Sequence, residues 1–82
     1  SHEYIIRIFR KYLHMTPTEF INLRRINYAM GLVVQKKYHI TDICYMSGFN
    51  NLSHFYAIFK KQTGYTPNEY LKVYGDNLEE ER

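Results

Sequence analysis

The chain has 82 residues, of which 45% are hydrophobic and 17% aromatic, so it can form one small folded domain and is too apolar to be disordered. It holds no run of 18 apolar residues, no secretory leader pattern and only one cysteine, so we expect a cytoplasmic protein rather than a membrane-spanning or disulfide-stapled secreted one. Residues 76–82 hold four of the eight acidic residues, which leaves residues 1–75 with 10 Lys and Arg against 4 Asp and Glu, a net charge of +6 that suits a polyanionic partner.

Residues 1–12 form the first predicted helix. One side of it carries an apolar stripe at helical spacing, made of Ile5, Ile8, Phe9 and Tyr12. The opposite side carries Glu3, Arg7 and Arg10, with Ile6 beside them. The polar face therefore presents two arginines.

The second predicted helix runs from Thr16 to about Lys36. It starts with a capping box, in which Thr16 is the N-cap, Pro17 the first helical residue and Glu19 the third. Two apolar stripes lie on opposite sides, one of Leu23, Ile26, Ala29, Met30 and Val33 and the other of Ile21, Tyr28 and Leu32. We therefore expect two packing partners, with local fraying at Gly31.

Residues 40–62 have the layout of a helix-turn-helix unit. A short helix over 40–47 has a narrow buried stripe, made of Ile40, Ile43, Cys44 and Ser47. Gly48 and Phe49 form the turn, and Asn50 or Asn51 caps a helix over 51–62. This helix gathers Leu52, Phe55, Ile58 and Phe59 on its buried face. Ser53, Ala57 and Lys60 point outward, with Tyr56 flanking them.

A third capped helix is predicted over residues 66–74, between Gly64 and Gly75, and its start repeats the one at Thr16. The repeat extends further, because the chain matches itself at an offset of 50 residues without a gap. Ile8, Phe9, Lys11, Thr16, Pro17 and Glu19 fall on Ile58, Phe59, Lys61, Thr66, Pro67 and Glu69. Residues 76–82 are expected to be a solvated acidic tail without function.

This repeat predicts a geometry. The helix over 16–36 spans roughly 30 Å at 1.5 Å per residue, close to one turn of B-DNA at about 34 Å. Two similar helices held by it could enter successive major grooves on one side of a duplex. The first unit lacks a counterpart of residues 40–50, so we expect a fragment whose Ile5, Ile8 and Phe9 are short of partners, with a loose or self-associating N-terminus.

These residues resemble the DNA-binding domain of the AraC/XylS family of bacterial transcription regulators. That family has paired isoleucines before a small residue, a Gly-Phe turn, a helix with Ser, two Phe and Lys, and then Gly-x-Thr-Pro-x-x-Tyr. The matching residues here are Ile40, Ile43, Cys44, Gly48, Phe49, Ser53, Phe55, Phe59, Lys60, Gly64, Thr66, Pro67 and Tyr70. Residues similar to the family's first recognition helix are Ser1, Tyr4, Ile5, Arg7, Phe9 and Arg10, and those similar to its linker helix are Arg24 or Arg25, Ala29, Leu32 and Val33.

The resemblance implies an all-α domain over 1–75, with a partial first unit over 1–15, a linker helix over 16–37 and a second homeodomain-like unit over 40–75. It also implies sequence-specific transcriptional control, often activation, with contacts to promoter DNA and to RNA polymerase and with an effector or dimerisation domain elsewhere in the protein. Three residues depart from the family pattern. Ala57 replaces a frequent arginine, Cys44 an alanine, and His14 the first unit's glycine. The change at Ala57 shifts base reading toward the first helix.

Arg7 is the best candidate for a base contact, because arginine donates two hydrogen bonds to guanine O6 and N7; a phosphate clamp or a solvated side chain is the alternative. Glu3 could accept from cytosine N4, and Ile6 and Tyr56 could touch thymine methyl groups. The residues expected at phosphates are Arg10, Lys60, Asn50, Asn51 and Ser53. His2, Leu52 and Ala57 complete the predicted DNA-binding set.

No catalytic or metal-binding group is predicted. The four histidines, His2, His14, His39 and His54, lack metal-ligand spacing, and Cys44 falls on a buried stripe. No cofactor or enzymatic activity is therefore expected. The alternative function is a helical protein-interaction module whose basic surface binds an acidic partner.

Overall fold

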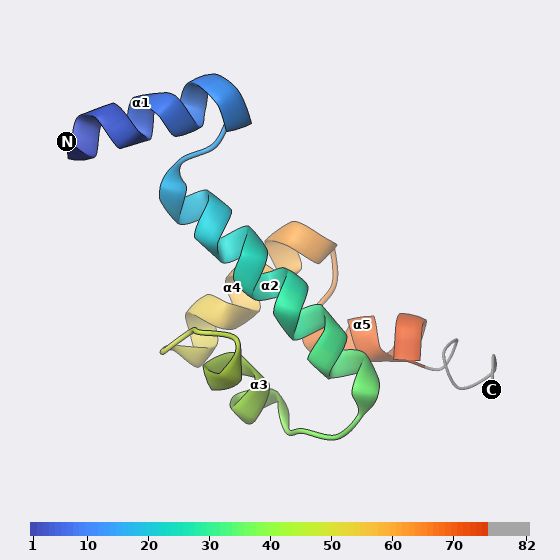
Figure 1. Cartoon of the computed structure of the whole chain (residues 1–82). Coiled ribbons are helices and arrows are strands. Elements are labelled where there is room, and N and C mark those ends of the chain that lie inside the picture. Colours follow the sequence, from blue (N-terminus) through green and yellow to red (C-terminus); the bar gives the residue numbers. More distant parts are fainter. Residues whose placement is uncertain (76–82) are drawn as a thin grey trace.

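The structure, a computed structural model, describes residues 1–75, and these residues fold into helical segments without strands (Figure 1). In chain order they are α1 (His2–Leu13), α2 (Pro17–Gln35), α3 (Ile40–Met46), α4 (Leu52–Thr63), α5 (Pro67–Tyr70) and a π-helical turn η1 (Leu71–Gly75). The predicted all-α fold is confirmed. The predicted acidic tail lies outside the described residues.

The helix starts are fixed by side-chain caps. The backbone N–H of Tyr4 donates to Ser1 Oγ at 3.2 Å, and that of His54 donates to Asn51 Oδ1 at 2.8 Å. Both predicted capping boxes form, at Thr16 with Glu19 and at Thr66 with Glu69. Each cap satisfies an N–H group that the first turn leaves unpaired, so these helices begin one residue after the capping side chain.

The final predicted helix was wrong in its second half. Residues 71–75 form a π-helical turn rather than a continuation of α5. In this wider turn Gly75 is buried, and a Cβ placed on it would lie 2.6 Å from Leu71 Cδ1 and 3.3 Å from Lys36 Cε. The glycine backbone therefore packs closely where a larger residue would displace its neighbours.

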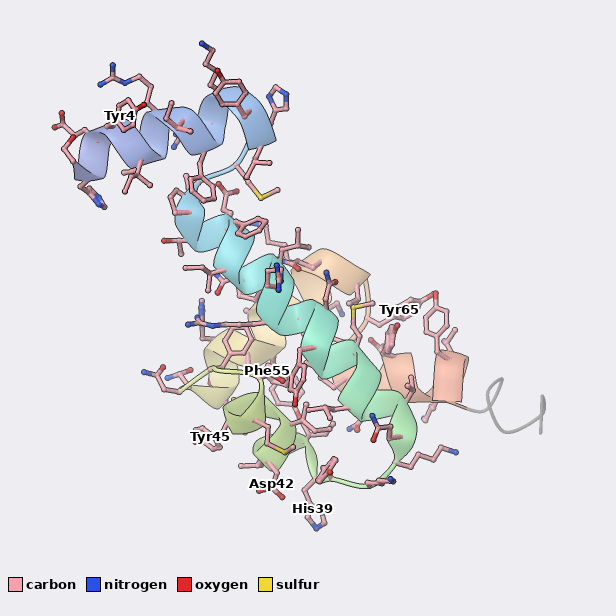
Figure 2. All side chains as sticks on the ribbon, viewed as in Figure 1. Tyr4, His39, Asp42, Tyr45, Phe55 and Tyr65 are labelled. Carbon is pink, nitrogen blue, oxygen red and sulfur yellow. The ribbon has the colours of Figure 1, made fainter. Side chains whose placement is uncertain are left out.

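The core lies between α2 and the three helices of the second unit. Ile26, Ala29, Leu32 and Val33 of α2 meet residues of α3, the turn and α4, namely Ile43, Cys44, Phe49, Phe55 and Phe59. Phe55 lies beneath α2 in Figure 2 and is fully buried. Burying one phenylalanine side chain stabilises the folded state by roughly 2–3 kcal/mol, because its apolar surface leaves water. This aromatic cluster is therefore the main stabilising element of the second unit.

Helix α2 packs against more than one partner, as predicted, but its second apolar stripe is covered only in part. Leu32 is buried, but Ile21 is 46% exposed and Tyr28 57% exposed. The spacing of apolar residues predicts that a helix face is apolar, but it does not predict which element packs against that face. The helix itself is continuous through Gly31, so the predicted fraying at that residue is absent.

Helix α1 projects away from the rest of the molecule at the N-terminal end of α2 (Figure 1). It holds no fully buried residue, and its ring contact with α2 is an edge-to-face pair of Phe9 and Phe20 with centroids 5.7 Å apart. Ile5 is 50% exposed and Tyr12 66% exposed. The expected shortage of partners is thus confirmed for Ile5, while Ile8 and Phe9 are half-buried.

The 50-residue repeat is a structural repeat. Helices α1 and α4 each have 12 residues at that offset, and each ends at a residue in the left-handed region, His14 with φ 57° and Gly64 with φ 83°. Each is followed by a Thr-Pro capping box.

Within residues 1–75, no helix combines the length and apolar character needed to cross a bilayer.

Candidate nucleic-acid interface

Two phenylalanines on one face of helix α4 pack into the core and fix the orientation of the helix. Phe55 and Phe59 are fully buried and lie four residues apart, so they fix which side of the helix faces the core. Ser53, Ala57 and Lys60 are consequently exposed, as predicted. Asn50 is exposed just before the helix, and Asn51 uses its side chain as the N-cap. The outward face of α4, made of Ser53, Ala57 and Lys60, is thus an exposed ridge that is accessible to a binding partner.

Two residues of α4 that were predicted to contact DNA also pack against the core. Leu52 and Tyr56 are half-buried and pack against the core cluster, and the Tyr56 ring lies 5.9 Å from that of Phe55. Only the part of each side chain that is turned away from the core is available to a ligand. Leu52 and Tyr56 therefore border the exposed ridge rather than lie on it.

On α1 the predicted residues His2, Glu3, Arg7 and Arg10 are all exposed, whereas Ile6 is half-buried. On the same helix the Lys11 ammonium group lies 5.3 Å from the centroid of the Tyr12 ring, while the Arg7 side chain is exposed. An exposed arginine on a helix with a weakly packed back can reach a ligand without breaking native contacts.

The basic ends of α1 and α4 both act on the start of α2. Hydrogen bonds from Thr16 lower the pKa of Glu19, and the positive charges of Lys61 on α4 and Arg10 on α1 lower it further. In the same way, hydrogen bonds from Thr66 lower the pKa of Glu69, with help from Lys60 and Lys72. The structure therefore brings positive charge from both repeat-related helices to the N-terminal half of α2.

Lys61 is a basic residue that the predicted DNA-binding set missed. It is exposed in the last turn of α4, and Lys11 occupies the equivalent position on α1. The 50-residue repeat pairs these two lysines in the sequence, so the repeat itself was the pattern that could have identified them.

Arg24 and Arg25 of α2 have different environments. The Arg24 guanidinium lies 6.0 Å from the Phe20 ring of the same helix, and Arg24 is exposed. Arg25 is half-buried, with its guanidinium 5.6 Å from the ring of Phe49 in the turn between α3 and α4. The sequence pattern offered Arg24 or Arg25 as the residue of the linker helix, and tertiary packing gives the two different environments.

The described residues contain no group of three His, Cys, Asp or Glu side chains that could hold a metal ion. Cys44 is buried in the core, and burial raises the pKa of its thiol. A raised thiol pKa lowers the thiolate fraction at neutral pH, which agrees with the predicted role of Cys44 as a small core residue.

Residues 1–73 match a protein family described as helix-turn-helix domain. The melibiose operon regulatory protein of Escherichia coli (strain K12) is 33% identical over 70 residues, which are 85% of this chain and 23% of that protein. The TCP pilus virulence regulatory protein of Vibrio cholerae serotype O1 (strain ATCC 39541 / Classical Ogawa 395 / O395) is 40% identical over 53 residues, 65% of this chain and 19% of that protein. This chain thus spans about a quarter or less of these curated relatives.

A solved structure of a protein of unknown function from Listeria innocua superposes with a TM-score of 0.80 at 38% sequence identity, covering 85% of this chain and 67% of that one. Further curated relatives include proteins described as HTH-type transcriptional regulators, from Pseudoalteromonas carrageenovora and Bacillus subtilis. The family match identifies a helix-turn-helix domain, and the solved structure has the same fold.

Proposed function

This chain belongs to the AraC/XylS family of helix-turn-helix domains. We propose that it binds DNA sequence-specifically as part of a bacterial transcription regulator, and that α1 and α4 enter successive major grooves of one duplex. The observation that carries this proposal is the structural repeat: two 12-residue helices, each with a side-chain N-cap and a left-handed C-cap residue, pack against one unbroken helix, α2. At about 1.5 Å per residue, the 19 residues of α2 span roughly 28 Å. This length is close to the rise of one turn of B-DNA, about 34 Å.

The chemistry of the exposed faces supports separate roles for the two helices. On α1, Arg7 would read a guanine and Glu3 a cytosine amino group, while Arg10 binds a phosphate. On α4, Ala57 is too short to read a base by hydrogen bonds, so Lys60 and the N-terminal residues Asn50, Asn51 and Ser53 would serve the phosphate backbone. Base discrimination would therefore rest more on α1 than on α4.

The complete regulator would act in the bacterial cytoplasm, where its promoter DNA lies. We propose that it contacts RNA polymerase as an activator and that effector binding or dimerisation belongs to other parts of the protein. We assign no catalytic role to this domain. We propose that it is divided by function into a partial first unit over 1–15, a linker helix over 16–37 and a second unit over 40–75.

The test is selection of duplexes from a random-sequence DNA pool by the 82-residue chain, followed by footprinting and titration at several salt concentrations. We expect a protected tract about two grooves long, and an affinity that falls with salt with a log-log slope of about 0.9 per phosphate contacted. Arg7→Ala should lower the preference for one base pair by about 1–3 kcal/mol, whereas Lys60→Ala should weaken all duplexes alike and reduce the salt slope by about one. Binding that does not depend on salt would contradict the proposal.

A second candidate function is recognition of an acidic protein surface by the same basic helices. The exposed apolar residues Ile21 and Tyr28 on α2 favour it, because exposed apolar side chains occur at protein interfaces. Footprinting separates the two functions. A chain that protects no DNA tract and selects no sequence, yet stays folded, would favour the protein partner.

A further inference from the structure

Arg25 covers the turn of the helix-turn-helix unit. Its guanidinium lies 5.6 Å from the centroid of the Phe49 ring. A Cβ built on Gly48 would meet Arg25 Nε at 3.0 Å and its Cδ and Cγ at 3.5 Å, so the side chain runs directly over the glycine backbone. A residue from α2 thereby contacts Gly48 and Phe49, two of the five residues (47–51) that connect α3 with α4.

The turn leads from α3 into α4 and so bears on the position of the N-terminus of α4. Gly48 has φ 98°, a left-handed conformation that glycine adopts without a steric penalty. Its N–H donates to Tyr45 O at 3.1 Å, and the N–H of Phe49 donates to Cys44 O at 3.1 Å. Phe49 is buried and its ring lies edge-on to those of His54 and Phe55, at 5.7 and 5.3 Å. Phe49 thus joins the turn to the first turn of α4.

We propose that Arg25 is a positioning residue for the recognition helix α4. It acts through Phe49 and Gly48 to hold the turn, and hence the N-terminus of α4, at a fixed place relative to α2. It does so without contacting DNA. The inference rests on the proposed entry of α4 into a major groove, and it assigns to α2 a second role besides spacing the two units.

The shape of the arginine side chain matters in this position. A guanidinium is planar and stacks on an aromatic face, whereas the ammonium group of lysine is a compact point charge on a flexible stem. The missing Cβ of Gly48 leaves the space through which the Arg25 stem passes. Lysine would therefore keep the charge and lose most of the contact.

Arg24 is a matched control on the neighbouring position. It also lies over a phenylalanine ring, but that ring belongs to Phe20, four residues earlier on the same helix. Arg24 is exposed, whereas Arg25 is half-buried. Replacing Arg24 removes the same charge and the same kind of cation–π contact without touching the turn.

The first measurement is amide hydrogen exchange on the 82-residue chain and its Arg25→Met, Arg25→Lys and Arg24→Met variants. In Arg25→Met we expect the Gly48 and Phe49 amides to exchange about two- to fivefold faster than in the unaltered chain, as expected for losing one cation–π contact. Amides within α2 should be unchanged, and Arg24→Met should leave the turn unaffected. Equal acceleration at every slow amide would overturn the inference, because Arg25 would then support only global stability.

The second measurement is affinity for a duplex selected by the unaltered chain, relative to a scrambled duplex, at several salt concentrations. A positioning role predicts that both Arg25→Met and Arg25→Lys lower this ratio at an unchanged salt slope. A slope reduced by about one in Arg25→Met, with binding retained in Arg25→Lys, would identify a phosphate contact and overturn the inference. If the unaltered chain selects no duplex, the proposed function fails, and the amide exchange still decides whether Arg25 holds the turn.

Discussion

His14 and Gly64 are equivalent residues that end α1 and α4 in the same left-handed conformation. For a residue with a Cβ, this conformation costs roughly 1–2 kcal/mol of folding free energy. Part of that cost is offset, because a glycine loses more conformational entropy when the chain folds. No atom lies within 4 Å of a Cβ placed on Gly64, so Gly64→Ala tests the backbone term alone. We expect this substitution to lower the free energy of unfolding by about 1 kcal/mol, measured by urea denaturation.

The control for that substitution is Gly31→Ala, which adds the same methyl group in open space but within regular helix. It should stabilise the domain by up to about 1 kcal/mol, because alanine is the better helix former. Equal effects of the two alanine substitutions would contradict the assigned backbone strain at residue 64.

The two capping boxes make stability depend on pH. Glu19 and Glu69 each accept a hydrogen bond from the backbone N–H of their N-cap threonine, at 2.9 and 2.8 Å, and this lowers the pKa of both carboxyls below 4.5. Because the folded-state pKa is below the unfolded one, the stabilisation is present above about pH 4.5 and is lost as the pH falls through the lowered value. We expect the melting temperature to fall on acidification in that range.

Glu69→Gln isolates this effect. Glutamine can still accept the N-cap hydrogen bond but does not ionise, so the melting temperature of the variant should vary less between pH 3 and pH 5 than that of the unaltered chain. Glu3→Gln, which removes an acid outside any capping box, serves as the control. An unchanged pH profile in Glu69→Gln would show that other groups cause the acid sensitivity.

At the scale of the helices, Phe9 and Phe59 are repeat-equivalent residues in unequal surroundings. Phe59 is fully buried in the core of the second unit, and Phe9 is half-buried against Phe20. Phe59→Ala should cost about 3–5 kcal/mol in free energy of unfolding, as expected for a cavity in a core. Phe9→Ala should cost about 1 kcal/mol, the size of one aromatic pair contact.

Chemical denaturation of both variants checks this difference. Amide exchange should localise the loss in Phe9→Ala to α1, because that helix opens without the core. Similar costs for the two substitutions would mean that α1 is as firmly packed as α4. The comparison thereby measures how independent the first unit is.

Much of this element arrangement could be predicted from the sequence, because local chemistry specifies it. Ser1, Thr16, Asn51 and Thr66 fix helix starts through hydrogen bonds to residues three positions later, so the expected bounds agree with the structure within one residue at these ends. The exposed side of α4 was equally predictable, since its buried phenylalanines recur at helical spacing.

The features that were missed depend on contacts between distant residues. Periodicity marked Ile21 and Tyr28 as an apolar stripe, but it does not indicate that both side chains stay exposed in the folded domain. The stacking of Arg25 on Phe49 joins residues 24 positions apart, and no spacing rule indicates such a pair. In the π-helical turn at 71–75, Gly75 likewise packs close to Lys36, a residue of a distant part of the chain.

At the scale of the whole molecule, the domain is elongated, with extents of 48 × 25 × 17 Å. The length arises because α1 extends beyond α2 instead of folding back on the second unit (Figure 1). An elongated basic molecule can follow one side of a duplex over more than one turn, whereas a single helix-turn-helix unit contacts one groove. The two helices that we propose to face DNA, α1 and α4, should therefore behave as linked binding sites.

Linked sites make binding sensitive to the distance between the two halves of the DNA sequence. In a duplex selected by the unaltered chain, inserting 5 bp between the two protected grooves turns one half-site to the opposite face of the helix, which has 10–10.5 bp per turn. We expect the affinity to fall to that of a duplex with one half-site scrambled, because α2 cannot follow the rotation. Titration of the unaltered, 5-bp-insertion and scrambled duplexes at one salt concentration checks this. If the insertion left the affinity unchanged while scrambling either half lowered it, α1 would be flexibly tethered and α2 would not set the spacing.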